Sequence, residues 1–213
     1  MDSRLINTIK TYDSTAEDYV EKTDNLLQRD RLNEFISCIG KQSGRVIDLG
    51  CGPGRDAEYL YNQGFNVVGM DLSSELLNIA RKRVPGGFFF NLDITSNLAG
   101  LWRANCDGVW ASASLVHVPL DNLFYTVGQV RDMLKPNGVF YARIMEGSGA
   151  EVRVSKRYGS VPGGEKFWQY FTEKTFAKAL FANSFDVLNV YLEQNEFSPK
   201  HPWMDFFARK KGK

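Results

Sequence analysis

The chain has 213 residues, which suits one α/β domain better than two small ones. With 43% hydrophobic and 24% charged residues, it has the composition of a globular protein with a buried core. A formal net charge of +1 provides no global field that attracts nucleic acid or an anionic membrane, although a local basic patch stays compatible with it.

The chain begins with helical signals and continues with alternating strands and helices. Residues 14–20 and 29–39 predict helices that lie across the carboxyl edge of a sheet. Apolar runs predict strands, and helical periodicity predicts helices between several of them. The strands are expected at residues 45–49, 66–70, 87–90, 108–111 and 139–142, and the helices at 53–62, after Ser73 and at 123–134. Apolar strands separated by helices indicate a parallel sheet covered on both faces.

The alternation of strands and helices ends in the last third of the chain. A helix predicted at residues 173–182 precedes two strand-like runs, 185–192 and 203–208, which are joined by a polar turn around residues 198–200. We expect this terminal hairpin to add an antiparallel edge to the sheet.

The three cysteines, Cys38, Cys51 and Cys106, stand far apart and form no CxxC pair. Since His117 and His201 are the only histidines, we predict neither a metal site nor a disulfide framework. The polar N-terminus lacks the apolar run of a signal peptide, and no stretch approaches the roughly 20 apolar residues of a membrane span. The expected location is therefore cytoplasmic, without a membrane partner.

The turn after the first strand carries the first functional signal. It reads DLGCGPGR from Asp48, so Gly50, Gly52 and Gly54 alternate and let the backbone approach a ligand closely. Asp71 closes the second strand about 20 residues later, where an acid that accepts ribose hydroxyls is expected. The structural alternatives are a simple tight turn for the glycines and a helix cap for Asp71. Together the two signals favour an adenosine ribose.

Asp48 helps to choose between two adenosine cofactors. The stretch GPGRDA from Gly52 formally satisfies the dinucleotide pattern, so a nicotinamide cofactor stays a weaker alternative. However, a carboxylate at Asp48 repels a pyrophosphate and suits a cation such as an α-ammonium group. S-adenosylmethionine has that ammonium, has a ribose and has no phosphate.

At this point the sequence resembles the class I S-adenosylmethionine-dependent methyltransferases. The matching segments are VIDLGCGPGR from Val46, GMDLS from Gly69, NLDI from Asn91, DGVWAS from Asp107 and MLKPNG from Met133. The resemblance implies a Rossmann-like, doubly wound sheet of seven strands, mostly parallel with an antiparallel last strand. It also implies that S-adenosylmethionine contacts Asp48, Gly50, Gly52, Gly54, Asp71, Leu72, Asp93, Ile94, Ala111 and Ser112, with Asp93 near the adenine amino group.

The resemblance extends to the N-terminus, where YDSTAEDY from Tyr12 is similar to the leading segment of many small members. It implies that Tyr12 and Tyr19, with Arg31 as the basic residue, border the methionine end of the cofactor. Packing of the tyrosines on a helix is the other interpretation. We therefore expect one methyltransferase domain over residues 1–213: N-terminal helices at 1–43, a cofactor-binding core at 44–145, and an acceptor-side lid, helix and hairpin at 146–213.

His117 follows the fourth strand and is the candidate catalytic residue. Methyl transfer needs the acceptor atom in line with the sulfur–methyl bond, and a base is required only if that atom holds a proton. An imidazole suits either a base or an acceptor-orienting group, whereas capping a turn is the structural alternative. Residues 146–170 mix cations and aromatics that form either a lid over an anionic or planar acceptor or ordinary packing, namely Arg153, Lys156, Arg157, Tyr158, Lys166, Phe167, Trp168 and Tyr170.

The acceptor is not specified by any motif. ASAS from Ala111 replaces the Asn/Asp-Pro-Pro-aromatic motif of enzymes that methylate base amines. We therefore favour transfer to an oxygen or nitrogen atom of a small-molecule or peptide acceptor. The alternatives are a tRNA- or RNA-modifying methyltransferase and a non-catalytic cofactor-binding protein. The oligomeric state cannot be predicted.

Overall fold

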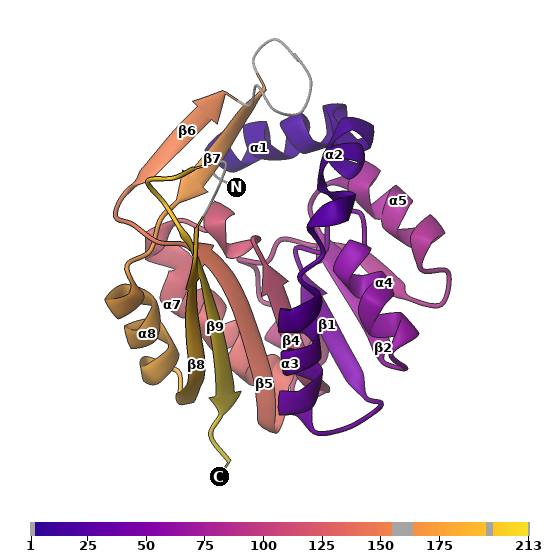
Figure 1. The fold of residues 1–213 in the computed structure, drawn as a ribbon, viewed down its shortest axis with the longest axis vertical. Helices are drawn as coiled ribbons and strands as arrows, with labels where there is room; N and C mark the ends of the chain where they lie inside the picture. Colours follow the sequence, from indigo (N-terminus) through magenta and orange to yellow (C-terminus); the bar gives the residue numbers. More distant parts are fainter. Residues whose placement is uncertain (1–2, 155–163, 195–197, 213) are drawn as a thin grey trace.

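The computed structural model describes residues 3–154, 164–194 and 198–212, and a seven-stranded sheet forms its centre (Figure 1). The strand order is β3-β2-β1-β4-β5-β9-β8. The strands are β1 (Arg45–Leu49), β2 (Asn66–Asp71), β3 (Phe88–Asn91), β4 (Cys106–Ser112), β5 (Leu134–Met145), β8 (Phe185–Glu193) and β9 (Trp203–Lys210). The first five are parallel, and β9 runs antiparallel to both β5 and β8. The doubly wound, mostly parallel sheet is confirmed.

The C-terminal hairpin forms the antiparallel edge of the sheet, as expected. β9 lies between β5 and β8, and β8 forms the edge. The reason is the burial of the two strands: Phe206 and Phe207 are buried on opposite faces of β9, whereas most of β8 is exposed. A strand buried on both faces belongs inside a sheet.

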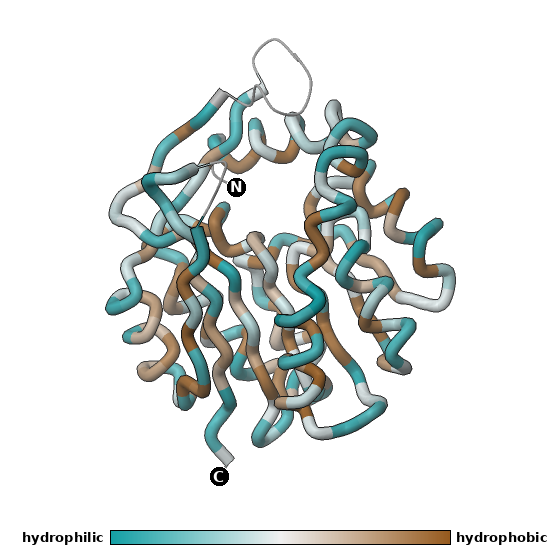
Figure 2. Tube along the Cα trace, viewed as in Figure 1, coloured by the Kyte–Doolittle hydropathy of each residue, from teal (hydrophilic) through white to brown (hydrophobic). Residues whose placement is uncertain are grey.

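Two helical layers cover the sheet. α3 (Arg29–Ile39), α4 (Arg55–Asn62) and α5 (Ser74–Arg83) pack on one face, and α6 (Ala99–Trp102), α7 (Leu120–Met133) and α8 (Glu173–Ala182) pack on the other. Each layer closes its own apolar core, and Figure 2 shows hydrophobic stretches in the central strands behind helices with hydrophilic outer surfaces.

The position of α3 corrects our expectation that this helix lies across the sheet edge. Its Phe35 ring packs edge-on against Trp110 of β4, with 5.2 Å between ring centroids. A Cβ added at Gly108 would lie 2.6 Å from the Phe35 ring, so this glycine allows the helix to approach the sheet. α3 is therefore part of a face layer.

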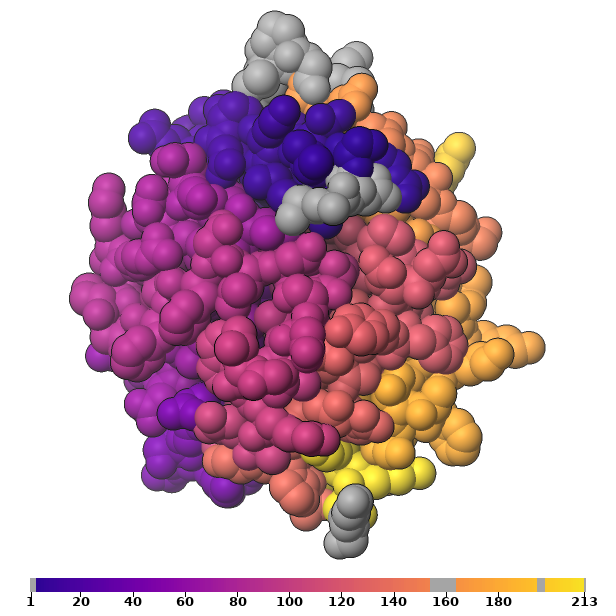
Figure 3. All heavy atoms as spheres, turned by 180° about the vertical axis from the view of Figure 1, so that it is seen from behind, coloured from indigo at the N-terminus to yellow at the C-terminus, as the bar shows by residue number. Residues whose placement is uncertain are grey.

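The carboxyl edge is covered by two elements that the sequence did not reveal as such. α1 (Ser3–Ser14) was not predicted, whereas the helix expected at residues 14–20 is α2 (Ala16–Thr23), which the short η1 (Asp24–Leu26) follows. β6 (Ala150–Val154) and β7 (Glu165–Gln169) form a separate antiparallel pair. α1 contacts β7 at one end and α5 at the other, and in Figure 3 the N-terminal residues lie directly on the part of the chain that follows β2.

The segment MLKPNG from Met133 leads from α7 into an irregular start of β5. The strand begins at Leu134, Asn137 has a φ of 62°, and the register with β4 shifts between Cys106 and Gly108. Within residues 3–154, 164–194 and 198–212, no helix has the length and apolar character needed to cross a membrane. The same ranges contain no cluster of three or more His, Cys, Asp or Glu side chains arranged to hold a metal.

Candidate active site

A pocket of about 720 Å³, partly open to solvent, lies where the carboxyl ends of β1 to β4 meet α1. It brings together ten of the residues predicted from the sequence, namely Tyr12, Tyr19, Gly50, Gly52, Asp71, Leu72, Asp93, Ile94, Ser112 and His117. Ligands bind at this edge in open α/β sheets.

The glycine turn forms the floor of the pocket. Gly50 and Gly52 have φ values of 77° and 52°, a left-handed conformation that favours glycine. A Cβ added at Gly50 would lie 2.2 Å from the Ser114 Cβ, so this glycine allows the β1 and β4 turns to meet. A Cβ added at Gly52 would have only Leu76 at 4.0 Å as a neighbour, and it would occupy open space in the pocket.

Asp71 holds the glycine turn and the start of α5 together. Its Oδ2 accepts a hydrogen bond from the Gly52 amide at 2.9 Å, and its Oδ1 accepts one from the Ser73 amide at 2.8 Å. Burial raises the pKa of Asp71, and these two amides oppose that rise. The carboxylate is thus fixed in orientation at the pocket wall, and each oxygen has a second lone pair for a ligand hydroxyl.

Asp93 is fixed in a similar way after β3. Its Oδ1 accepts hydrogen bonds from the Thr95 amide at 2.8 Å and from the Thr95 hydroxyl at 2.7 Å. Ile94 between them also lines the pocket. Asp71 and Asp93 therefore place two carboxylates on the β2–β3 side.

Three predicted cofactor residues lie behind the pocket wall instead of on it. Asp48 is 2% exposed, and burial, followed by the charge of Asp56, raises its pKa well above its usual range. Gly54 allows α4 and α5 to approach, since a Cβ there would lie 3.0 Å from the Ala80 Cβ. Ala111 belongs to the apolar core. Asp48 belongs to β1, Ala111 to β4 and Gly54 to the start of α4, and the three residues support the wall from behind.

The turn after β4 is strained and faces the pocket. Ala113 has a φ of 58°, which is uncommon for a residue with a Cβ, and its amide donates to the Arg143 carbonyl at 3.0 Å. Ser112, Ala113 and Ser114 all line the pocket. The turn thus presents three consecutive small residues to a ligand.

His117, in the short η2 (Leu115–His117), is joined to the N-terminal helix. Its Nδ1 lies 2.6 Å from the Phe167 carbonyl, which can only accept, so Nδ1 carries the proton. Its Nε2 lies 3.0 Å from the Tyr12 hydroxyl and accepts that hydrogen bond. Burial, assisted by the charge of Lys166, lowers the pKa of His117 to about 4. The imidazole is therefore neutral at pH 7.

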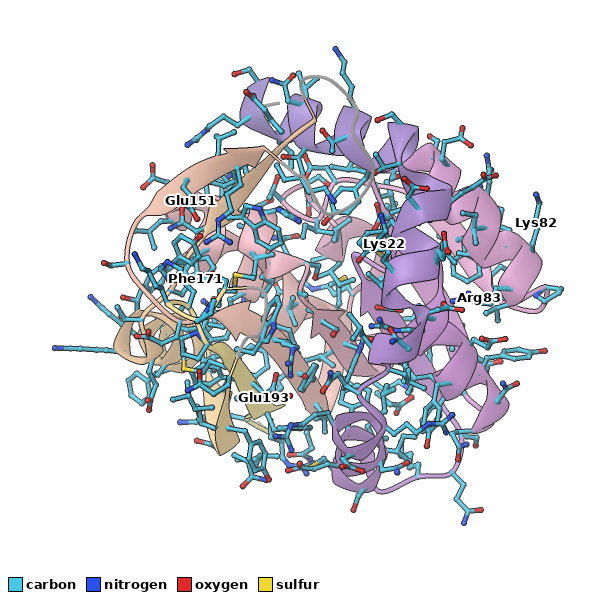
Figure 4. All side chains as sticks on the ribbon, turned by 45° about the horizontal axis from the view of Figure 1, so that its top comes forward. Lys22, Lys82, Arg83, Glu151, Phe171 and Glu193 are labelled. Carbon is cyan, nitrogen blue, oxygen red and sulfur yellow. The ribbon has the colours of Figure 1, made fainter. Side chains whose placement is uncertain are left out.

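The β6–β7 pair borders the same end of the pocket. Trp168 of β7 lies 5.0 Å from His117 between ring centroids, and the Lys166 Nζ lies 3.5 Å from the centre of the Tyr12 ring. With the carboxyl edge turned forward in Figure 4, Glu151 of β6 and Lys22 of α2 lie on opposite sides of this edge. Lys156, Arg157 and Tyr158 of the expected lid lie outside the described residues.

Arg31 is not one of the residues that line the pocket. Its Nε donates to Asp205 Oδ2 at 2.9 Å, and its guanidinium lies 3.9 Å from the centre of the Tyr191 ring. The strong hydrogen bond to β9 fixes Arg31 on the sheet face together with α3, which explains why it does not border the methionine end as expected.

The sequence reasoning missed the part of the pocket contributed by α1. Leu5 and Ile9 line it without having been predicted, and they precede the predicted Tyr12 at spacings of four and three residues. This is the period of one helix face, so the signal was present in the sequence. Ser114 and Thr95 had no comparable signal, because isolated hydroxyl residues in turns are common.

Comparison with known proteins agrees with this geometry. The model of the methyltransferase domain family matches residues 19–190, most of the chain. This chain belongs to the class I S-adenosylmethionine-dependent methyltransferase family.

Among its relatives in the family are two curated enzymes. A malonyl-[acyl-carrier protein] O-methyltransferase from Enterobacter lignolyticus is 31% identical over 116 residues, which cover 54% of this chain and 45% of that enzyme. A trans-aconitate 2-methyltransferase from Delftia acidovorans is 30% identical over 141 residues, which cover 65% of this chain and 51% of that enzyme. The chain spans about half the length of these curated relatives.

Solved methyltransferases share the fold over nearly their whole length. Magnesium protoporphyrin IX methyltransferase from Synechocystis, solved with bound S-adenosylmethionine, superimposes with a TM-score of 0.71 at 17% identity, covering 99% of this chain and 98% of that one. A Burkholderia thailandensis 1,6-didemethyltoxoflavin-N1-methyltransferase superimposes with a TM-score of 0.67 at 20% identity. The superposition covers 94% of this chain and 89% of that one. At this identity the likeness concerns the fold.

S-adenosylmethionine is the cofactor of this family, and the pocket of this chain fits it. Asp48 Oδ2 and Ser114 Oγ are buried at the glycine turn and have no hydrogen-bond partner among the described residues. An ammonium group supplies the donors that such oxygens require. The space beside Gly52 admits a ligand at close range, and Asp71 is oriented for ribose hydroxyls.

Proposed function

We propose that this chain transfers the methyl group of S-adenosylmethionine to an oxygen or nitrogen atom of a small-molecule or peptide acceptor. The observation that carries the proposal is a single pocket with Asp71 and Asp93 on one side and His117 and Tyr12 on the other. Such a pocket has a place for the nucleoside and a separate place for a reacting atom. When bound, the cofactor supplies an electrophilic methyl group on a sulfonium.

We assign roles to the residues from their positions. Asp71 accepts the ribose hydroxyls, Asp93 and Ile94 border the adenine, and Gly50 and Gly52 admit the amino acid part beside Asp48. Leu72 and Ser112 complete the wall, and Tyr12 and Tyr19 close it from the N-terminal helices. The chain thereby positions the reactants, and positioning is the main requirement of a direct displacement.

His117 orients the acceptor through the Tyr12 hydroxyl in this proposal and does not remove a proton. A base works best with a pKa near the operating pH, whereas burial lowers the pKa of His117 to about 4. Its Nε2 already accepts a hydrogen bond from Tyr12, so the Tyr12 hydroxyl is the group fixed at the acceptor end. This arrangement suits an acceptor atom without a proton at neutral pH.

The relatives support an acceptor of that kind. Their names specify malonyl-[acyl-carrier protein] and trans-aconitate as acceptors, and both compounds carry carboxyl groups. A carboxylate oxygen is unprotonated at neutral pH and needs no general base. We therefore regard a small carboxylate as the first class of acceptor to screen.

The test of this function is ligand-induced stabilisation. The melting temperature is measured with S-adenosylmethionine, S-adenosylhomocysteine, NAD and NADP, for the wild type and for Asp71→Ala. A ligand at 100 times its Kd stabilises the native state by about 2.7 kcal/mol. We expect only the two sulfur cofactors to stabilise the wild type, and the variant to lose most of that effect. Stabilisation by the nicotinamide cofactors alone would contradict the proposal and indicate an oxidoreductase.

A further inference from the structure

A lysine of the β6–β7 pair places a positive charge behind the tyrosines of the pocket. The Lys166 Nζ lies 3.5 Å from the centre of the Tyr12 ring and 5.3 Å from the centre of the Tyr19 ring. The residue is 1% exposed, although lysine is rarely buried in proteins. The faces of aromatic rings attract a cation, so the two tyrosines hold the ammonium at this end of the pocket.

Backbone contacts on both sides of Lys166 fix its side chain against α1. The Thr11 hydroxyl donates to the Glu165 carbonyl at 2.9 Å, and the Phe167 amide donates to the Thr8 hydroxyl at 2.9 Å. Because side chains alternate along a strand, Lys166 and Trp168 share one face of β7. That face contacts Tyr12 through Lys166 and His117 through Trp168.

The charges of the pocket wall are unbalanced for the cofactor. The charged residues among its described lining are Asp71 and Asp93, and this lining contains no lysine or arginine. Arg31 is paired with Asp205, and Arg55 is bound to Asp56 and to the Thr23 carbonyl. S-adenosylmethionine nevertheless carries an α-carboxylate, and a carboxylate in a buried site requires a cation or several donors.

We infer that Lys166 binds a carboxylate at the Tyr12–Tyr19 end of the pocket. The carboxylate is either that of the methionine part of the cofactor or one carried by the acceptor. An ammonium has three N–H donors, so the same group lies on the Tyr12 ring and donates to the bound carboxylate. This inference rests on the proposed function, because only the cofactor or its acceptor brings a carboxylate to this pocket.

Calorimetric binding separates the two sources without relying on turnover. The ligands are S-adenosylhomocysteine and its decarboxylated analogue, S-adenosyl-3-thiopropylamine, which keeps the ammonium. The proteins are the wild type, Lys166→Met, and Lys166→Arg as the control that keeps the charge. If the carboxylate belongs to the cofactor, Lys166→Met weakens the binding of S-adenosylhomocysteine about 10- to 100-fold. The affinity for the decarboxylated analogue then changes by no more than about twofold. Lys166→Arg retains most of the affinity.

The second arm uses protein saturated with S-adenosylhomocysteine and titrated with trans-aconitate or malonate. If the carboxylate belongs to the acceptor, Lys166→Met binds S-adenosylhomocysteine like the wild type but binds one of these acids about tenfold more weakly. Unchanged S-adenosylhomocysteine affinity, together with no acid binding that depends on Lys166, overturns the inference. A wild type that does not bind S-adenosylhomocysteine at all contradicts the proposed function itself.

Melting temperatures of the unliganded proteins distinguish a binding role from a structural one. Methionine fills a similar volume without a charge, so we expect Lys166→Met to melt at or above the wild-type temperature. A lower melting temperature with full ligand affinity would assign Lys166 to the fold alone. If Lys166→Met does not fold, the wild type alone still tests whether the cofactor carboxylate is bound. Equal affinities of the wild type for S-adenosylhomocysteine and the decarboxylated analogue would exclude a bound cofactor carboxylate.

Discussion

Tyr12 and His117 are 105 positions apart in the sequence, yet the Tyr12 hydroxyl lies 3.0 Å from the His117 Nε2. This hydrogen bond joins the N-terminal helix to the turn after β4 across one end of the pocket. The tautomer of the imidazole is settled by the Phe167 carbonyl, which accepts a hydrogen bond from the protonated Nδ1. A contact between two such distant segments makes the pocket dependent on the docking of α1.

Tyr12→Phe tests this contact directly. The variant keeps the ring but leaves Nε2 buried without a donor, which costs about 1–3 kcal/mol. The neutral imidazole loses a stabilising hydrogen bond, so the pKa of His117 should rise from about 4. Ring NMR of His117 reports both its pKa and its tautomer. Tyr59→Phe, which removes an exposed hydrogen bond to Asn33, should leave both unchanged.

His117 should make the stability of the protein depend on pH in a defined window. The pKa is lowered from 6.5 to about 4, so between these values the unfolded chain binds a proton that the folded chain does not. The contribution of neutral His117 is complete above pH 6.5 and is lost as the pH falls to about 4, up to about 3 kcal/mol. Urea unfolding at several pH values should show this slope, and His117→Gln should flatten it. Parallel curves for the two proteins would contradict the assignment.

Gly52→Ala should separate backbone strain from loss of the binding space. Gly52 and Gly40 both have left-handed φ values, 52° and 69°, so alanine at either position costs about 1 kcal/mol or more. An added Cβ lies in the pocket at Gly52, whereas nothing lies within 4 Å of it at Gly40, the C-cap of α3. We expect comparable destabilisation of both variants and a loss of S-adenosylhomocysteine affinity of about tenfold or more only for Gly52→Ala. Equal affinities would place the cofactor elsewhere.

Asp205→Asn should destabilise the fold without changing ligand affinity. Asp205 is fully buried and accepts hydrogen bonds from Arg31, Arg143 and Tyr141. Removing its charge takes away the buried partner of Arg143, which keeps only the half-exposed Glu193 at 2.8 Å, so we expect a cost of about 3 kcal/mol. The exposed pair of Asp186 and Lys211 provides the control, since Asp186→Asn should cost less than about 1 kcal/mol. Chemical unfolding measures both changes, and a small effect at Asp205 would show that the buried network is dispensable.

The sequence alone determined the sheet and the floor of the pocket. The apolar runs of β1, β2, β4 and β5 specify buried parallel strands, and the turn with Gly50 and Gly52 directly follows one of them. Asp71 ends β2 and Asp93 closely follows β3, so their place at the same edge follows from parallel strand order. Such features are local, because a few adjacent residues fix both the backbone and the position.

Tertiary structure alone decided which distant side chains complete the pocket. The pairings of Tyr12 with His117 and with Lys166 depend on how α1 and β7 dock over the sheet edge, which no local spacing encodes. Arg31 is placed by its ion pair with Asp205, and that partner exists only because β9 is inserted between β5 and β8. Contacts of this kind arise from burial and charge pairing between segments far apart in the chain, so they form only when the whole core closes.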